Sequence, residues 1–473
     1  MKIHDTLTRT KREFEPLEPG KVRMYVCGVT PYDFIHIGNA RCAVFFDVVR
    51  RYLEYKGYDV NYVTNFTDID DRIIARANDA GVTFSEYAGQ YMKEFFTDSD
   101  GLNIKRATAY PLATEHIPEM ISMISILVND GYAYEKKGSV FFDTEKMENY
   151  GTLSHRCAQE QEAGARIKVD AEKKNPLDFV LWKPAKPGEP FWESPWGNGR
   201  PGWHIECSVM TLAHLGETID IHAGGDDLLF PHHENELAQS EAANKKKFSN
   251  YWMHLGMVNV SNRKMSKSLG NFFTVRDLAE TYGYDVLRFF LVSNHYRPPL
   301  NYTPEILDAS ANAFTRIKNC MSELSRRISE APDGGLKPGE ADEIMEFLAF
   351  EQSFISSMDD DFNTANAVTA LFEMVKFINK RTAAGNDYSS EFYRQMKDKF
   401  EELCGILGLN PMESKKSFGG DTASIEELVA RRDEARANRD WALADELRGE
   451  LTKLGVELKD TPEGAKWAFV KRS

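Results

Sequence analysis

The 473-residue sequence has no long hydrophobic run. A membrane-spanning helix needs about 18 or more consecutive apolar residues, and the longest candidate, MISMISILV at residues 120–128, is too short. The amino-terminal residues carry charge with no apolar core behind it, so we expect no secretory leader. These absences predict a chain without a membrane span and favour the cytoplasm.

Cysteine is scarce and dispersed. The six cysteines lie at positions 27, 42, 157, 207, 320 and 404, with no tight pair. That spread favours reduced thiols in a cytosolic enzyme over a disulfide framework. Basic charge is also in the minority, because the formal net charge is −15. This sum argues against nucleic acid by itself, but an acidic protein can still carry a local basic face.

The first third of the chain alternates apolar runs with helical patterns. Residues 21–29 predict a strand, residues 39–58 a helix and residues 59–70 a second strand. A strand, helix and strand of this length form a βαβ unit, which implies a parallel sheet with a right-handed crossover. Ligands bind beyond the carboxyl ends of such strands. Three residues fall at these ends: Cys27, His36 and Thr67.

The length suggests about three domains. We predict an α/β fold with a Rossmann-type parallel-sheet domain in residues 1–302, split by an insertion at about 100–200. Residues 303–408 read as a helical bundle without strands, and residues 409–423 as a polar linker. The last part, residues 424–473, predicts a small α+β domain of two helices and a hairpin around TPEG.

The stretch PHHENE at residues 231–236 raises the question of a metal. In a helix beginning at Pro231, His232 and Glu236 would share one face. Zinc accepts imidazole, carboxylate and thiolate, and Cys27 and Cys207 could supply two sulfurs from distant parts of the chain. A surface His–Glu pair beside two buried cysteines fits these residues equally well.

Two other metal chemistries fit poorly. The metalloprotease motif needs a second histidine four residues after the first, where this chain has Glu236. The acidic run at residues 359–361 could suggest calcium, but the glycine and terminal glutamate of an EF-hand loop are missing.

Two short motifs predict a nucleotide site. HIGN at residues 36–39 lies between a strand end and a helix start, where backbone N–H groups and the helix dipole favour phosphate. KMSKS at residues 264–268 places two lysines three apart on a loop, which suits the charge that develops in phosphoryl or nucleotidyl transfer. No Walker-type glycine loop is present in the sequence.

These two motifs resemble the HIGH and KMSKS motifs of class I aminoacyl-tRNA synthetases. Longer stretches resemble the cysteinyl-tRNA synthetase family specifically: MYVCGVTPYDFIHIGNAR, NFTDIDD, GRPGWHIECS, GGDDLLFPHHENE and KMSKSLGNFFTVRD. They extend over residues 24–277, and MDDDFNTANA and DWALADELRGEL further on are also similar, so nearly the whole chain is covered. Asn39 stands where the family motif has its second histidine; it keeps a hydrogen-bond donor but excludes a cationic role there.

The resemblance implies that the chain activates L-cysteine with ATP to cysteinyl-adenylate and transfers cysteine to the 3′ end of tRNA(Cys), releasing AMP and pyrophosphate. It implies Mg²⁺ with the ATP and one zinc ion per chain, whose role is to select the substrate thiolate. The implied zinc ligands are Cys27, Cys207, His232 and Glu236. His204, His222 and His233 are equally compatible with a place beside this site or a structural role. A monomer is expected from the family.

The same resemblance assigns the other site residues. The residues implied for ATP are His36, Gly38, Asn39, Lys264, Ser266 and Lys267, of which His36, Asn39, Lys264 and Lys267 are expected to be catalytic. The residues implied for the amino acid are Gly28, Thr67, Trp203 and Asp227. The bundle is expected to contact the tRNA, and the last domain to read its anticodon, with Trp467, Lys466, Lys471 and Arg472 as candidates.

Three rival functions remain at this stage. A ligase joining cysteine through its adenylate to an amino-sugar would share the catalytic half, but this chain keeps about 50 residues after its linker. A zinc-bearing tRNA-binding module without catalysis is disfavoured by the two lysines of KMSKS. A zinc hydrolase is disfavoured by the ligand spacing.

Overall fold

The computed structural model describes residues 1–155, 172–261, 263–264, 272–332, 334–412, 422–437, 440–453, 456–461 and 464–469. At Lys264, and at many positions from 422 onward, the description covers the backbone alone.

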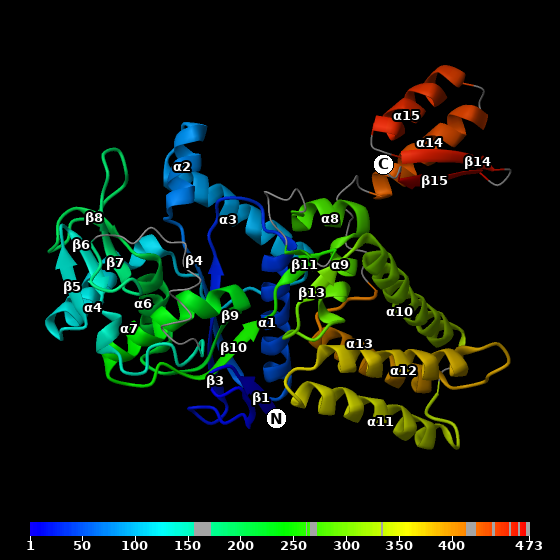
Figure 1. Ribbon diagram of the computed structural model, residues 1–473. Coiled ribbons are helices and arrows are strands. Elements are labelled where there is room, and N and C mark those ends of the chain that lie inside the picture. Colours follow the sequence, from blue (N-terminus) through cyan, green and yellow to red (C-terminus); the bar gives the residue numbers. More distant parts are fainter. Residues whose placement is uncertain are drawn as a thin grey trace.

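A four-stranded parallel sheet forms the centre of the amino-terminal half, which lies before the bundle (Figure 1). Its strands are β3 (Lys21–Val29), β4 (Asp59–Phe66), β9 (Ile219–Gly225) and β10 (Ser249–Leu255), in the order β10-β9-β3-β4. Helix α1 (Ile37–Tyr55) connects β3 to β4, which confirms the predicted βαβ unit. Strand β9 is buried along almost its whole length, as expected for a parallel strand covered on both faces.

An insertion separates β4 from β9 and builds a second sheet, which is antiparallel with the order β5-β6-β7-β8. The helices α2 (Asp71–Ala80) and α3 (Phe84–Gly101) follow β4 directly. The remaining elements up to β9 are η1 (Ala113–His116), α4 (Ile117–Asn129), β5 (Ala133–Lys136), β6 (Ser139–Phe142), η2 (Thr144–Lys146), β7 (Phe179–Pro184), β8 (Gly199–Pro201) and α6 (Trp203–Leu215). This small sheet and its helices lie to the left in Figure 1.

Between β9 and β10 the chain forms two short turns and a helix: η3 (Asp226–Leu228), the π-helical turn η4 (Leu229–His233) and α7 (Glu234–Asn244). After β10 a three-stranded sheet joins the amino-terminal half to the bundle, with the order β12-β11-β13. Its elements, with two helices, are β11 (Val258–Val260), β12 (Arg263–Lys264), α8 (Val275–Tyr282), α9 (Tyr284–Val292) and β13 (Leu300–Tyr302). At the amino terminus, β1 (Lys2–Asp5) and β2 (Thr10–Glu13) form a hairpin.

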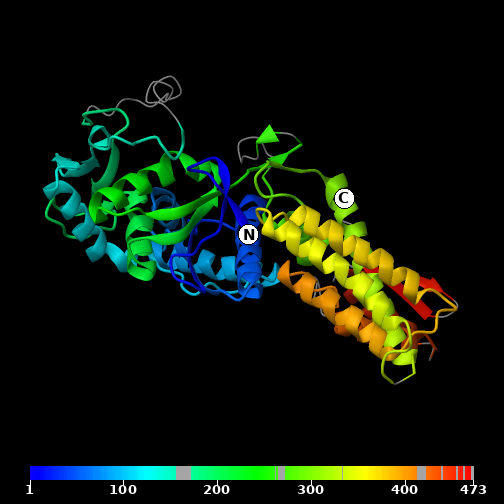
Figure 2. The same ribbon diagram turned by 90° about the horizontal axis from the view of Figure 1, so that it is seen from below.

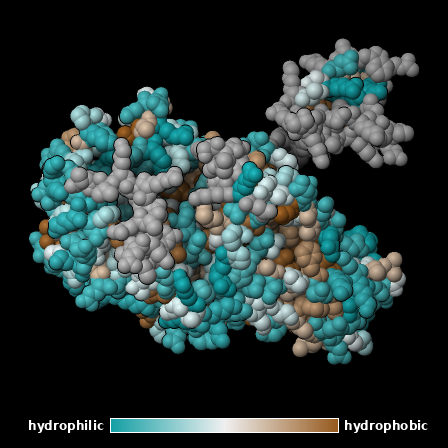
Figure 3. Space-filling view, viewed as in Figure 1, coloured by the Kyte–Doolittle hydropathy of each residue, from teal (hydrophilic) through white to brown (hydrophobic). Residues whose placement is uncertain are grey.

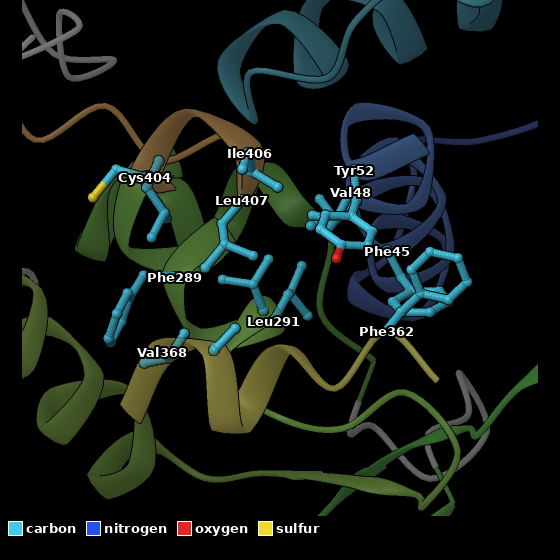
Figure 4. Packing of buried hydrophobic residues seen from close by; sticks show 14 of the residues in the cluster. Phe45, Val48, Tyr52, Phe289, Leu291, Phe362, Val368, Cys404, Ile406 and Leu407 are labelled. Atoms are coloured by element: carbon cyan, nitrogen blue, oxygen red, sulfur yellow. The ribbon is translucent and has the colours of Figure 1, made fainter. Parts of the chain in front are cut away.

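Four helices form the bundle: α10 (Pro304–Glu330), α11 (Glu340–Asp359), α12 (Thr364–Thr382) and α13 (Ser390–Ile406) (Figure 2). One hydrophobic core runs from the bundle into the amino-terminal half. Figure 4 shows this continuity, because Phe45 and Tyr52 of α1 pack beside Leu291 of α9, Phe362 and Leu407. The bundle is therefore packed directly against the helix that begins at the HIGN motif.

The last unit contains α14 (Thr422–Ala437), α15 (Trp441–Lys453) and the antiparallel hairpin β14 (Val456–Thr461) and β15 (Gly464–Phe469). In Figure 1 it stands apart from the bundle, at the upper right. Hydrophilic residues cover most of the face seen in Figure 3. Among the described residues, no helix combines the length and apolar character that crossing a membrane requires. The predicted fold class is confirmed, while the domain boundaries at 302, 408 and 423 stay predictions.

Candidate metal and nucleotide site

Cys27 and Gly28 lie at the carboxyl end of β3, where the pairing of β3 with β4 shifts its register between Val26 and Val29. The irregularity brings the backbone of Gly28 against Asn65 near the end of β4, and the Gly28 N–H donates to Asn65 Oδ1 at 2.9 Å. A Cβ at position 28 would lie 1.7 Å from the Asn65 carbonyl oxygen. Only glycine therefore allows this close approach of the two strand ends.

The four predicted ligands come together from four separate elements. Cys27, Cys207, His232 and Glu236 offer donor atoms that all lie within 4.8 Å of one another, and all four residues are buried. Glu236 Oε1 lies 2.9 Å from His232 Nε2 and 3.4 Å from Cys27 Sγ. Sequence-distant thiols thus meet one imidazole and one carboxylate at the strand ends, although metal binding by them stays a prediction.

The chain is helical from Pro231 onward, as supposed, but it is not one regular α-helix. Residues Leu229–His233 form the π-helical turn η4, and the α-helix α7 follows from Glu234. Phe230 adopts extended backbone angles, φ −140° and ψ 131°, which the residue before a proline prefers. His232 and Glu236 make contact across the junction of η4 and α7, as their spacing predicted.

The environment of Glu236 fits a cation. Its carboxylate is fully buried, and in the described part of the chain only histidines lie within ion-pair distance of it: His222, His232 and His233. A buried carboxylate is costly unless positive charge lies beside it. A protonated His232 supplies such charge, and a bound cation would supply it in place of that proton. Buried Nδ1 of His222 and Nε2 of His233 also have no hydrogen-bond partner. Two thiols, imidazole and carboxylate are the donors that zinc accepts.

The cluster also shifts the ionisation of its members. The pKa of Cys207 is lowered to about 6, chiefly by its hydrogen bond with Cys27 and, against the effect of burial, by its contacts with His232. Burial opposes a charged His232, but the Glu236 carboxylate and hydrogen bonds to Cys207 and Glu236 raise its pKa to about 10. Burial raises the pKa of Cys27 above its usual value. A cysteine that loses its proton near neutral pH is the form that ligates metal.

Further histidines surround the cluster. Cys27 and Glu236 also belong to a second buried donor group with His222 and His233. His233 Nδ1 lies 2.7 Å from His254 Nε2, and His254 Nδ1 lies 2.8 Å from the Thr6 hydroxyl. His204 Nδ1 lies 2.9 Å from His232 Nδ1. His204, His222 and His233 therefore support the cluster by direct contact, and His254 was missed because nothing in WMHLG distinguishes it from a strand residue.

Two of the residues predicted for the amino acid, Trp203 and Thr67, are linked by contacts to the same cluster. Trp203 begins α6 and stacks on the His232 ring, with 40% of its surface exposed. Thr67 is buried and donates to Glu206 Oε2 at 3.0 Å, while Asn65 Nδ2 donates to the Thr67 hydroxyl at 3.4 Å. Asp227 lies in the exposed turn η3 after β9. Asn65 and Glu206 were missed as residues that hold this end of the sheet, although both lie inside the motifs NFTDIDD and GRPGWHIECS.

The HIGN motif forms the amino-terminal cap of α1. His36 Nδ1 accepts hydrogen bonds from the backbone N–H groups of Gly38 and Asn39 at 3.1 and 3.2 Å. In return, Asn39 Oδ1 accepts from the His36 N–H at 3.3 Å. A neutral His36 therefore carries its proton on Nε2, and Asn39 keeps its amide N–H₂ as a donor. Asparagine fits this capping box because its oxygen is the acceptor that the cap needs.

The chain that follows KMSKS contacts the HIGN motif. Lys264 ends β12, whose partner β11 belongs to the connecting sheet. Beyond the second motif, Thr274 forms a bridge with His36, and the Val275 N–H donates to the Ile35 carbonyl at 2.9 Å. The Phe272 and His36 rings lie edge to face, 5.4 Å apart. The predicted Ser266 and Lys267, and the side chain of Lys264, lie outside the described residues.

Family models cover three parts of the chain. A model described as the tRNA synthetases class I (C) catalytic domain matches residues 13–312, the DALR domain matches residues 353–410, and the cysteinyl-tRNA ligase anticodon binding domain matches residues 420–467.

Curated relatives are similar over the full length. The chain is 52% identical to a cysteine–tRNA ligase of Clostridioides difficile, over 99% of both chains. It is 51% identical to one of Lachnospira eligens, over 99% of this chain and 100% of the relative.

Solved structures share the fold at low identity. A Mycobacterium tuberculosis methionyl-tRNA synthetase in complex with methionyl-adenylate has a TM-score of 0.59 and 15% identity, over 90% of this chain and 96% of that one. A putative arginyl-tRNA synthetase of Campylobacter jejuni has a TM-score of 0.56 and 14% identity, over 85% and 95%. The models and the full-length identities show that the chain belongs to the cysteinyl-tRNA synthetase family of class I aminoacyl-tRNA synthetases.

Proposed function

We propose that this protein charges tRNA(Cys) with L-cysteine in two steps that use ATP. One observation carries the proposal: four buried side chains bring their donor atoms together at the strand ends, namely Cys27, Cys207, His232 and Glu236. The strand that carries Cys27, β3, also leads into the capped start of α1. A sulfur-selective site and a phosphate-selective helix terminus on one sheet suit the activation of a thiol-bearing amino acid.

The four clustered residues would hold one zinc ion. Zinc bound there would supply selectivity, because a thiolate is a far better partner for this ion than a serine hydroxyl. A bond that the competing amino acid cannot form gives a large discrimination ratio, whereas an apolar pocket distinguishes near-isosteres poorly. Such a site makes a separate editing domain unnecessary. Trp203 would form one wall for the amino acid, Asp227 would pair with its ammonium group, and Gly28 and Thr67 would line the opening.

Residues of the first motif would bind ATP. His36, with its proton on Nε2, and the amide of Asn39 would donate hydrogen bonds to the phosphates. The positive end of α1 favours the same charge, and Gly38 leaves room for the nucleotide. Lys264, Ser266 and Lys267 would bind the triphosphate from the second motif, with Mg²⁺ accompanying the nucleotide.

Neither step requires a nucleophile from the protein, so its residues would act mainly by positioning the substrates. In the first step the cysteine carboxylate attacks the α-phosphorus, and pyrophosphate leaves with the electrons of the broken P–O bond. In the second step the terminal ribose hydroxyl of the tRNA attacks the activated carbonyl, and AMP leaves. The residues of this chain contribute orientation and charge stabilisation of both steps.

The bundle and the last unit would bind tRNA(Cys). Single-stranded anticodon bases are recognised by stacking and by hydrogen bonds to their edges. Trp467 and Lys466 belong by their backbone to β15, while Lys471 and Arg472 lie outside the described residues. All four stay candidates for this contact. We also propose that the protein acts as a monomer in the cytoplasm.

The decisive experiment is exchange of labelled pyrophosphate into ATP, run with cysteine and with serine, followed by aminoacylation of tRNA with a cysteine anticodon. We expect exchange with cysteine alone, and charging of that tRNA. Cysteine-dependent exchange without charging, but with ligation of cysteine to an amino-sugar, would establish the rival ligase instead.

A further inference from the structure

The segment between α9 and β13, residues 294–298, is held from one side by a single guanidinium. Arg41 lies in the first turns of α1, two residues after Asn39, and only 2% of its surface is exposed. It donates to the carbonyl oxygens of His295 and Tyr296, each at 3.1 Å, and of Pro298 at 2.8 Å. The ring of Tyr296 stacks on Phe45, one helical turn further along α1.

The same guanidinium holds the start of β11. Arg41 also donates to the Gly256 carbonyl and to the Met257 carbonyl at 3.1 Å. Gly256 has no room for a side chain, because a Cβ would lie 2.4 Å from the Arg297 carbonyl oxygen. Strand β11 pairs with β12, which ends at Lys264. One side chain thus joins the helix of the first motif to the strands that lead into the second.

The bundle holds this segment from the other side. Asp361, fully buried between α11 and α12, accepts from the Tyr296 hydroxyl at 2.8 Å and pairs with Arg297 Nε at 2.9 Å. It also accepts from the His4 N–H at 2.8 Å. The Thr364 hydroxyl, at the start of α12, donates to the Asn294 carbonyl at 3.1 Å. These contacts give the last aspartate of the acidic run 359–361 a role that the sequence left open.

The bonding of Arg41 is unusual for a buried cation. Among the described residues no carboxylate forms an ion pair with it, and its five acceptors are all main-chain carbonyls. The planar guanidinium is suited to such a fan of acceptors, whereas a lysine ammonium offers three donors from one point. Arg41 therefore fixes the position of residues 256–257 relative to residues 295–298.

We propose that Arg41 is a positioning residue for ATP, and that Asp361 couples it to the bundle through residues 294–298. Arg41 sets the place of the α1 terminus relative to β11, and the bundle sets the place of the segment that Arg41 holds. The inference rests on the proposed function in one respect, namely that the α1 terminus binds ATP.

The test measures direct binding of MgATP to the full chain by calorimetric titration, for Arg41→Lys, Asp361→Asn and the double variant. Glu340→Gln is the matched control, because Glu340 is a buried carboxylate of the same bundle that also accepts three hydrogen bonds, from Lys337 N–H and from the N–H and hydroxyl of Ser389. Cysteine affinity is measured separately and reports on the metal cluster. None of these substitutions changes a residue of that cluster.

We expect each single variant to bind MgATP about five- to tenfold more weakly, since small displacements of a positioning group are costly. The double variant should bind MgATP no more weakly than the single variant with the lower MgATP affinity. Cysteine affinity should stay near the wild-type value in all these variants. Glu340→Gln should bind MgATP like wild type. Additive losses, or an equal loss in Glu340→Gln, would overturn the inference.

Tyr296→Phe keeps the test decisive if Asp361→Asn fails to fold. It removes one hydrogen bond to Asp361 while the ring remains able to stack on Phe45. A partial loss of MgATP affinity is expected, and an unchanged affinity would contradict the coupling. A protein that binds MgATP normally yet shows no cysteine-dependent exchange would refute the proposed function and leave this inference intact.

Discussion

The indole of Trp203 stacks on the imidazole of His232, with ring centroids 4.2 Å apart and planes inclined by 28°. This contact links the predicted wall of the amino-acid site to a predicted metal ligand. Aromatic pairs of this kind contribute about 0.5–1.5 kcal/mol beyond their buried area. The stack therefore links the position of the proposed amino-acid wall, Trp203, to the orientation of the His232 ring.

Replacing Trp203 by alanine should raise the KM for cysteine about two- to tenfold, because it removes one wall of the proposed site and the stacking contact that holds the His232 ring. The KM for ATP should change little, because the cap of α1 is formed by other residues. Pyrophosphate exchange with each substrate varied in turn measures both constants. Trp203→Phe keeps an aromatic ring and should behave like wild type; an equal rise of both constants would refute the assignment.

Cys207→Ser should remove metal and weaken cysteine binding much more than ATP binding, because a hydroxyl is a poor zinc ligand compared with a thiolate. Metal content by mass spectrometry and the two KM values give the readout. Cys320→Ser is the matched control, since it makes the same change at a buried position of α10. Equal losses of cysteine and ATP binding would indicate a purely structural ion.

Removal of metal with a chelator, followed by addition of zinc, provides the complementary test. We expect cysteine-dependent exchange to fall and to return on adding zinc, while MgATP binding persists throughout. Metal affinity should decline as the pH is lowered, because protons compete with the ion for thiolate, imidazole and carboxylate. Full exchange activity in metal-free protein would contradict the proposed role of the cluster.

Lys267→Ala should slow adenylate formation by an amount equivalent to about 2–4 kcal/mol, the usual cost of one preorganised charge contact in a transition state. Single-turnover measurement of adenylate formation isolates this step. Lys245→Ala serves as the control, because Lys245 is an exposed lysine paired with Asp130 on the surface. A wild-type rate in the Lys267 variant would remove that lysine from the mechanism.

Gly28→Ala should lower the stability of the catalytic half by about 1–3 kcal/mol or more, because overpacking forces the backbone to move and the added carbon would meet the Asn65 carbonyl. Gly89→Ala should act in the opposite direction. Gly89 lies inside α3 with open space around its Cβ position, so alanine should stabilise that helix by about 1 kcal/mol. The midpoint of thermal unfolding measures both effects, and it should fall for Gly28→Ala and rise for Gly89→Ala.

The sequence predicted those features that rest on periodicity or on residue type. Strand, helix and strand around residues 21–66 follow from the spacing of apolar residues, and the grouping of Cys27, Cys207, His232 and Glu236 follows from the donors that one ion accepts and from the family motifs. The π-helical turn η4 before α7 was not predicted, because a helical spacing rule does not distinguish a π-helical turn from an α-helix.

Long-range polar contacts escaped prediction for a different reason. Arg41 reads as an ordinary helix residue, since its five acceptors are carbonyls 215 to 257 positions away along the chain. Backbone carbonyls carry no residue signature. Asp361 was considered only as a calcium ligand, because the tyrosine and arginine that it meets lie 65 and 64 positions earlier.

The order of the clustered donors along the chain has a consequence for biosynthesis. Cys27 leaves the ribosome early, but His232 and Glu236 follow some two hundred residues later, after the whole insertion has been made. A nascent chain shorter than 236 residues cannot present all four donors. Loading of the proposed ion would therefore require that the segments carrying these donors have already come together, and a truncated or misassembled chain would be left without it.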